Sequence, residues 1–280
     1  MSYKRILTIQ DISCFGQCSL TVALPILSAC GIETCVLPST VLSTHTGGFK
    51  GYTFRDLTED IPEIQKHWVK EKIKFDAFYT GYLGSVKQIE YVKNMFDATG
   101  NPDSIRVVDP VIGDYGKLYA GFDDKFIDAM KDLCRSADYI LPNITEACLL
   151  TGTEYKEEYD ESYIDELLSK LESSFKATII LTGACCFDNK TGIAIHKKGN
   201  KTYYQHKKIA GSYHGTGDIF ASAFSGALLN GKSEYNSAKI AADYTLECIQ
   251  ATTDAQEHWY GTRFELALGK LIDSLKEVGN

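Results

Sequence analysis

The sequence has little positive charge and no long apolar run. Its 280 residues include 29 Lys and Arg against 37 Asp and Glu, a formal net charge of −8. This balance argues against nucleic acid or an anionic membrane as a partner. No run of about 18 apolar residues occurs, so no membrane-spanning helix is expected. Residues 1–10 are too short and too polar for a secretory signal, and we expect a cytoplasmic protein.

Disulfide and zinc frameworks are also missing. The nine cysteines form no C-x-x-C pair and no Cys/His spacing of a zinc site. Most of them lie in apolar runs, which is typical of reduced, buried thiols. Hydrophobic residues make up 44% of the chain, so a core of ordinary size needs no disulfides.

What the chain does have is a regular alternation of strand-like and helical segments. Predicted strands cover 5–10, 32–37, 76–80, 106–109, 139–141 and 178–182, and predicted helices cover 19–30, 62–70, 86–97, 123–133 and 164–173. A hairpin is expected over 192–206, and helices over 216–229, 233–251 and 263–278. This order predicts an α/β fold with a central, mostly parallel sheet between two helical layers. No linker divides the chain, so residues 1–280 are expected to form one domain.

Polar residues follow the predicted strands at their carboxyl ends. Ligands of open α/β sheets bind at this edge. The residues at or just beyond a strand end are Asp11, Thr46, Tyr82, Asp109, Asn143 and Thr182.

The segment from His214 to Asp218 (HGTGD) directly precedes an apolar helical pattern. Free N–H groups and the helix dipole favour phosphate at such a position. An aspartate beside them can take a proton from an incoming hydroxyl. The segment therefore suggests phosphoryl transfer. The alternative is an ordinary helix entry capped by Thr216 or Asp218.

Two further segments carry carboxylates at strand ends. Asp109 and Asp114 lie in DPVIGDYG, a pair that suits Mg²⁺ beside substrate phosphates. Asn143 and Glu146 lie in LPNITE, where Glu146 either positions a metal-bound water or merely complements the helix dipole. Asp109 has a structural alternative too, as a turn residue at the strand end.

Residues 226–233 (GALLNGKS) match the Walker A pattern, but the context excludes a phosphate loop. Such a loop follows a strand and opens a helix. Here helical periodicity runs into the motif from Ile219 onward, and Gly231 is expected to end that helix.

Together, DPVxGD, PNxxE and GTGD resemble the motifs of ribokinase-like small-molecule kinases, in this order and over nearly the whole chain. Within that superfamily the chain is similar to pyridoxal/pyridoxamine (vitamin B6) kinases. The narrower resemblance rests on residues 43–47 (STHTG), 80–85 (TGYLGS) and 6–10 (ILTIQ).

The resemblance implies a ribokinase-like three-layer α/β/α sandwich, often a homodimer, that uses ATP, Mg²⁺ and a monovalent cation such as K⁺. It implies Asp218 as the catalytic base and the amides of Gly215, Thr216 and Gly217 as an anion hole. The implied metal-side residues are Asp109, Asp114 and Glu146. The implied ATP contacts are Asn143, Glu146, Thr182 and Thr216. The implied vitamin contacts are Asp11, Thr46, Gly47, Tyr82 and Asp218.

Two positions depart from the family pattern. Asp11 replaces the usual Ser, and a carboxylate there is suited to a protonated ring nitrogen. Gly183 follows Thr182 where Ser is common, which weakens the assignment of ATP contacts in that segment. A hydroxymethylpyrimidine kinase and a non-catalytic B6-binding protein remain the alternative functions.

Overall fold

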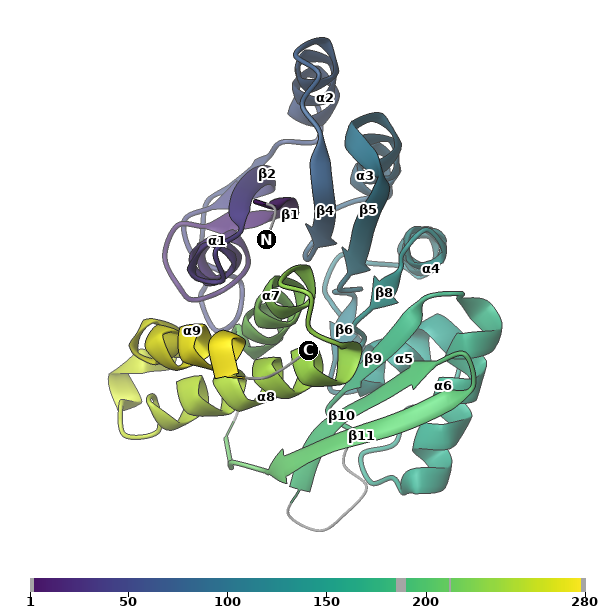
Figure 1. Cartoon of the computed structure of the whole chain (residues 1–280), viewed down its shortest axis with the longest axis vertical. Helices are drawn as coiled ribbons and strands as arrows, with labels where there is room; N and C mark the ends of the chain where they lie inside the picture. The colour runs from purple at the N-terminus through teal and green to yellow at the C-terminus, as the bar shows by residue number, and fades with distance from the viewer. Residues whose placement is uncertain (1–2, 185–189, 212, 278–280) are drawn as a thin grey trace.

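The computed structural model describes residues 3–184, 190–211 and 213–277. Within them a nine-stranded sheet has the order β11-β10-β9-β8-β5-β4-β1-β2-β3 (Figure 1). The strands are β1 (Arg5–Ser13), β2 (Glu33–Leu42), β3 (Phe54–Asp56), β4 (Phe75–Thr80), β5 (Gly100–Val108), β8 (Tyr139–Ile140), β9 (Thr178–Thr182), β10 (Lys190–Lys197) and β11 (Asn200–Lys207). The six strands from β9 to β2 are parallel, and the remaining strands pair antiparallel at the two edges.

Helices cover both faces of this sheet. One layer contains α2 (Asp60–Lys70), α3 (Val86–Thr99), α4 (Asp124–Arg135), α5 (Ile144–Thr151) and α6 (Glu161–Ser174). The other contains α1 (Leu20–Ala29), α7 (Thr216–Leu229), α8 (Glu234–Gln250) and α9 (Leu268–Glu277). Short 3₁₀ helices cover Gln256–His258 and Phe264–Ala267. The predicted three-layer α/β/α sandwich is confirmed.

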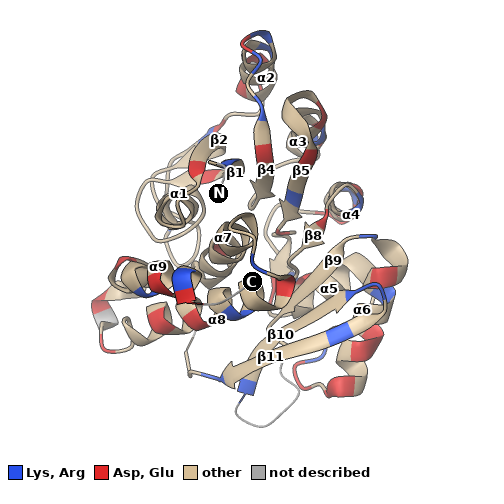
Figure 2. Ribbon diagram, viewed as in Figure 1, with Lys and Arg blue, Asp and Glu red and all other residues tan. Residues whose placement is uncertain are grey.

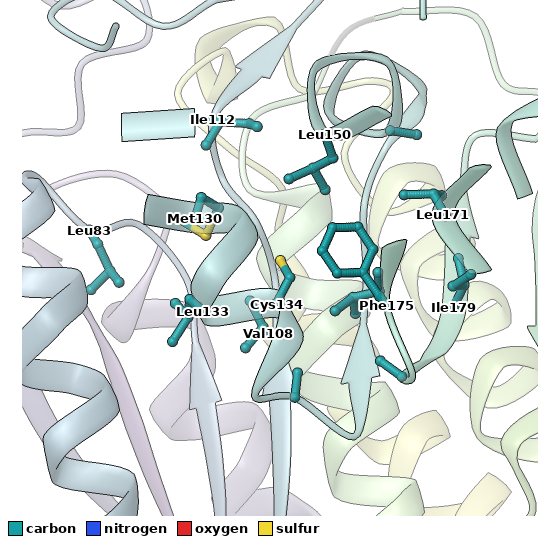
Figure 3. Close-up of a cluster of buried hydrophobic side chains, with 14 of the residues drawn as sticks. Leu83, Val108, Ile112, Met130, Leu133, Cys134, Leu150, Leu171, Phe175 and Ile179 are labelled. Atoms are coloured by element: carbon teal, nitrogen blue, oxygen red, sulfur yellow. The ribbon is translucent and has the colours of Figure 1, made fainter. Parts of the chain in front are cut away.

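Two hydrophobic clusters, one on each face, form the core. Neighbouring residues of a strand point to opposite faces, so Leu7 packs toward α2–α6 and Ile6 toward α1 and α7–α9. Figure 3 shows part of the first cluster, with side chains from strands (Val108, Ile179) and from helices (Met130, Leu171) directed toward one another. The sheet is therefore buried on both sides, which fixes where its strand ends lie.

The chain reverses direction across the sheet between β1 and β4. From β1 it passes through α1 to β2 on one side, whereas from β4 it passes through α3 to β5 on the other. Because α1 and α3 lie on opposite faces, a crevice is expected outside the carboxyl ends of β1 and β4. The expected ligand site thus lies around residues 11–19, 80–82 and 109–118.

Most predicted elements are present within a few residues of their expected bounds. Three short strand segments escaped prediction, namely β3 and the hairpin of β6 (Gly113–Asp114) with β7 (Lys117–Leu118). They have two or three residues each, too few for a periodic signal. The helix expected over 263–278 begins instead as the 3₁₀ turn Phe264–Ala267 before α9. Helix α7 runs through Gly226 to Leu229, and Gly231 has φ +82°, so the rejection of a Walker A loop is confirmed.

Charged residues of both signs lie mainly on the outer helices and the β10–β11 hairpin, whereas α7 is almost free of charge (Figure 2). Asp218 is the single charged residue of α7. A carboxylate in such a helix has no neighbouring charge of its own helix to neutralise it. In the part of the chain that is described, no helix is long and apolar enough to cross a bilayer.

Candidate active site

The N-terminus of α7 presents main-chain N–H groups without side-chain caps. Gly215 is its N-cap residue, with φ +79°, a left-handed conformation that favours glycine, and no described side chain caps the helix. A side chain added at Gly217 would meet only open space. The Thr216 hydroxyl donates to the Tyr213 carbonyl at 3.2 Å, which fixes the turn. The first-turn N–H groups are therefore available to an anion.

The loop between β1 and α1 packs directly against this turn. A Cβ on Gly215 would lie 1.9 Å from the Gln17 carbonyl oxygen, so only glycine fits. The Gln17 N–H donates to the Tyr260 carbonyl at 3.3 Å, which links the loop to the segment before α9. The close approach brings residues near 11–19 next to a turn about 200 positions later in the chain.

Asp218 lies in the first turn of α7 with its carboxylate toward this loop. Its Oδ2 accepts a hydrogen bond from the Ser19 N–H at 2.9 Å. Burial raises the pKa of Asp218 to about 7, the negative charge of Asp11 adds to the rise, and the Ser19 hydrogen bond opposes it. A carboxyl group with this pKa exchanges protons near neutral pH, as a general base must.

Asp109 follows β5 and is close enough to Asp218 for their charges to interact. It is 8% exposed. Burial raises its pKa well above the usual value, and the negative charge of Asp218 raises it further. Cys18 lies near both Asp218 and Asp11, and burial followed by these charges raises the pKa of its thiol. The structure thus brings the expected base and the first expected metal-side carboxylate together.

Glu146 and Asn143 form a complete capping box at the start of α5. Asn143 Oδ1 accepts from the Glu146 N–H at 2.9 Å, and Glu146 Oε2 accepts from the Asn143 N–H at 2.8 Å. Asn143 Nδ2 also donates to the Gly113 carbonyl, and Glu146 Oε1 accepts from the Ile112 N–H. Both side chains therefore have a structural task, which is to tie the loop after Asp109 to α5.

Asp114 lies at the tip of that loop, in β6. Its Oδ1 accepts from the Tyr115 N–H at 2.8 Å, and partial burial raises its pKa. It also raises the pKa of Glu146 slightly, after the stronger effects of burial and Asp109. The three expected metal-side carboxylates are neighbours. Across residues 3–184, 190–211 and 213–277, however, no three His, Cys, Asp or Glu side chains converge closely enough to form a metal cluster.

The chemistry of these carboxylates nevertheless fits a hard cation. Burial and neighbouring carboxylates raise the pKa of Asp109 and Glu146, and no cationic side chain of the described residues is among the causes. Oxygen ligands of this kind suit Mg²⁺, which usually takes one or two carboxylates and completes its shell with water and phosphate. Such an ion would relieve the repulsion between these carboxylates.

The expected vitamin contacts lie on the β1 and β4 side. Asp11 is 6% exposed and accepts from the Ser13 hydroxyl at 3.0 Å. Tyr82 is half-buried, and the charge of Asp11 contributes to its raised pKa, second only to burial. Asp11 is therefore close to both Tyr82 and Asp218.

Thr46 and Gly47 belong to a loop held by aromatic rings. Thr46 is exposed, and a Cβ on Gly47 would lie 2.7 Å from the His214 ring. The His45 ring accepts from the Gly47 N–H through Nδ1 and contacts the Tyr260 carbonyl through Nε2 at 2.8 Å. The His45 and His214 ring centroids are 5.1 Å apart. This loop thus touches the segment that leads into the α7 turn.

Thr182 lies at the end of β9. Its N–H and hydroxyl both contact the Pro142 carbonyl, at 2.9 and 3.4 Å. It therefore adjoins the Asn143 cap. Cys185 and Cys186, expected as reduced thiols, lie outside the described residues, whereas the seven described cysteines are free. Two cavities of the described residues, of about 280 and 460 Å³, lie elsewhere, near Leu271 and near Asn230.

Sequence reasoning missed Ser19 and His45. In the sequence, Ser19 looks like an ordinary residue at a helix start. Its hydrogen bond to Asp218 becomes visible only in the folded structure. His45 lies within the segment that carried the resemblance, but nothing in its residue type predicts two main-chain partners. No signal in the sequence distinguishes either residue from its neighbours.

Comparison with known proteins agrees with this geometry. The family model described as phosphomethylpyrimidine kinase matches residues 25–262. The chain belongs to this family. Among curated relatives, the pyridoxal kinase PdxY of Actinobacillus pleuropneumoniae is 26% identical over 273 residues and 90% of each chain. The pyridoxal kinase of Dictyostelium discoideum is 28% identical over 240 residues, 79% of this chain and 77% of the relative.

Solved structures of the same fold cover nearly the whole chain. A putative phosphomethylpyrimidine kinase from Bacteroides thetaiotaomicron, in a crystal form with pyridoxal, is 36% identical with a TM-score of 0.90 over 96% of each chain. The pyridoxal kinase of Lactobacillus plantarum is 31% identical with a TM-score of 0.91 over 100% of each chain. These findings confirm the predicted ribokinase-like fold and the recognition of a vitamin B6 kinase.

Proposed function

We propose that this protein is an ATP-dependent kinase that phosphorylates the 5′-hydroxymethyl group of pyridoxal, pyridoxamine or pyridoxine. The observation that carries the proposal is the position of Asp218. Its pKa is raised to about 7, it lies in the first turn of α7 beside uncapped N–H groups, and a second carboxylate, Asp109, is its neighbour. A base, an anion-binding turn and a cation-binding carboxylate are the parts that phosphoryl transfer to an alcohol needs.

In this proposal Asp218 accepts the hydroxyl proton as the alcohol oxygen attacks the γ-phosphorus. A bond forms between that oxygen and phosphorus, and the bond from phosphorus to the bridging oxygen of ADP breaks. The N–H groups of Gly215, Thr216 and Gly217 stabilise the charge on the transferring group. The open space beside Gly217 leaves room for the phosphate.

Mg²⁺ would be held by Asp109, with Asp114 and Glu146 nearby, and a monovalent cation such as K⁺ is expected in the same region. When bound, Mg²⁺ neutralises charge on the ATP phosphates. The Asn143–Glu146 capping box fixes the loop that carries Asp114. Asn143, Glu146, Thr182 and Thr216 are the proposed ATP contacts.

The vitamin would lie between Asp11, Thr46, Gly47 and Tyr82, with its hydroxymethyl group toward Asp218. Asp11 is buried and adjoins Tyr82 and Asp218, which suits a carboxylate that pairs with a protonated ring nitrogen. Two similar structures support this ring as the acceptor, because one is a pyridoxal kinase and the other was crystallised with pyridoxal.

We further propose one kinase domain over residues 1–280 that acts in the cytoplasm as a homodimer, without nucleic-acid or membrane partners. Seven free cysteines in the described residues are typical of a reducing compartment. The net charge of −8 disfavours polyanionic partners.

A coupled assay of ADP release tests the function. Pyridoxal, pyridoxamine, pyridoxine and hydroxymethylpyrimidine are compared as acceptors at equal concentrations. We expect the highest kcat/KM with a B6 vitamer. A clear preference for hydroxymethylpyrimidine would instead identify a pyrimidine kinase, the second candidate, which the description of the matching family model favours. If none of the acceptors leads to ADP release, a non-catalytic B6-binding protein becomes the favoured candidate.

A further inference from the structure

Ser19, the residue before α1, has a backbone conformation that serine rarely adopts. Its φ is +54° and its ψ is −131°. The Cβ of an L-residue is crowded in this conformation, whereas glycine adopts it freely. A strained residue beside a reactive carboxylate calls for a functional account.

The two main-chain polar groups of Ser19 both have hydrogen-bond partners. Its carbonyl accepts from the Val22 and Ala23 N–H groups, at 3.0 and 2.9 Å, and so begins α1. Its N–H donates to Asp218 Oδ2 at 2.9 Å. Its hydroxyl makes no helix cap. Burial raises the pKa of the neighbouring Asp11 carboxyl, and the Ser19 hydroxyl opposes that rise.

The strained backbone of Ser19 explains how one residue can reach two carboxylates. A serine with negative φ at a helix N-cap normally turns its hydroxyl back to the first turn. The positive φ of Ser19 instead directs its N–H outward to Asp218 and frees its hydroxyl for Asp11. Glycine would supply the N–H alone, and alanine would have the strain without the hydroxyl contact that compensates for it.

The hydrogen bond also orients the proposed base. Among the described residues, the Ser19 N–H is the one hydrogen-bond donor found for the Asp218 carboxylate, and it occupies Oδ2. Oδ1 is then the oxygen left to take a proton. The neighbouring peptide is held as well, because the Cys18 carbonyl accepts from the Thr21 hydroxyl at 2.7 Å.

We propose that Ser19 is a positioning residue that joins the two carboxylates of the acceptor side. Its N–H holds Asp218 so that Oδ1 faces the alcohol, and its hydroxyl holds Asp11 toward the acceptor ring. The inference rests on the proposed kinase function. On this inference, the main-chain N–H of Ser19 supports kcat, and its hydroxyl supports binding of the acceptor.

Two matched variants, Ser19→Gly and Ser19→Ala, separate these two roles. Both lack the hydroxyl, so both should raise KM for the vitamer by a similar factor, about 5-fold for one lost hydrogen bond. Glycine keeps the backbone conformation, so kcat should stay within about 2-fold of wild type. Alanine relaxes toward negative φ and withdraws the N–H from Asp218, so kcat should fall at least about 10-fold.

A double-mutant cycle with Asp11→Ala gives an independent test. If the hydroxyl acts through Asp11, Ser19→Gly should raise KM no further in the Asp11→Ala background. Equal kcat in the Gly and Ala variants, or KM factors that multiply, would overturn the proposal. If Ser19→Ala does not fold, the Gly variant and the cycle still decide.

The same cycle can be read without turnover. Urea unfolding of the four proteins, free of substrate, should show that Ser19→Gly and Asp11→Ala are coupled rather than additive. If the two substitutions are coupled in stability but the wild type has no kinase activity, the proposed function is refuted and the Ser19–Asp11 contact is retained. Activity without coupling would refute the role of the Ser19 hydroxyl alone.

Discussion

The two sides of the proposed site hold their carboxylates in different ways. On the α5 side, Glu146 and Asn143 form four structural hydrogen bonds, and their places can be explained by the cap alone. On the α7 side, the one donor that the described residues offer to the Asp218 carboxylate is a main-chain N–H, and it comes from a strained residue. The α5 side is built for stability, whereas the α7 side has features that stability does not require. This difference supports the proposal that the reactive group lies on the α7 side.

The largest expected effect is that of Asp218→Asn. Without the carboxylate, no base is left at the acceptor, so kcat should fall at least roughly 100-fold while both substrates still bind. Steady-state rates together with calorimetric binding of ATP and pyridoxal measure this. Asp128→Asn, on the exposed face of α4, is the control and should turn over normally. Near-normal turnover of Asp218→Asn would remove the distinction between the two sides.

Gly215→Ala should have the next largest effect. The new methyl would approach the Gln17 carbonyl to 1.9 Å, so the turn and the β1–α1 loop must separate. We expect kcat to fall at least about 10-fold and stability by about 2 kcal/mol. Gly231→Ala is the matched control, because Gly231 has a similar φ of +82° with nothing within 4 Å of the added atom. That variant should lose about 1 kcal/mol and keep its kinetics.

Asn143→Ala, on the α5 side, should lower stability and leave turnover almost unchanged. Loss of the N-cap should lower the free energy of unfolding by about 1–2 kcal/mol. Turnover at saturating ATP should change little, with a rise in KM for ATP of no more than about 5-fold. Urea unfolding and initial rates measure the two effects. A large loss of kcat with unchanged stability would show that Asn143 contributes to the chemistry.

The smallest effect concerns the charge at Asp109. Its pKa is raised in the folded state, so the native protein binds this proton more tightly than the unfolded chain. Its contribution to stability is thus present at low pH and is lost as pH rises through the folded pKa. Without divalent ions, Asp109→Asn should therefore stabilise the protein at pH 8 by about 1 kcal/mol and less at pH 5. Urea unfolding at both values tests this, and an equal shift at both would refute the assignment.

Much of this site could be predicted because its main residues lie in local patterns. The turn at Gly215–Asp218 joins two glycines to the start of an apolar helix, and both features are visible in a single segment. The strand-end positions of Asp11 and Asp109 follow from the alternation of strands and helices. Periodicity therefore located the residues, and the topology of the sheet brought them together.

The remaining features depend on contacts that no local pattern encodes. The positive φ of Ser19 accompanies a hydrogen bond to Asp218, 199 positions away, and serine has no preference for that conformation. The β6–β7 hairpin is held to α5 by Asn143 and Thr145, which bind its backbone at Gly113 and Gly116. Both features depend on contacts between distant parts of the chain, so their residues look ordinary in the sequence.

The contact between Gln17 and Gly215 restricts how such an enzyme can change its acceptor. The loop proposed to border the acceptor ring also touches the turn proposed to bind phosphate, with no spare volume between them. Substitutions that enlarge the loop near Gln17 would therefore disturb the donor side as well. New acceptor preferences are easier to reach through Asp11 or the exposed Thr46, where a side chain can change without moving the phosphate turn.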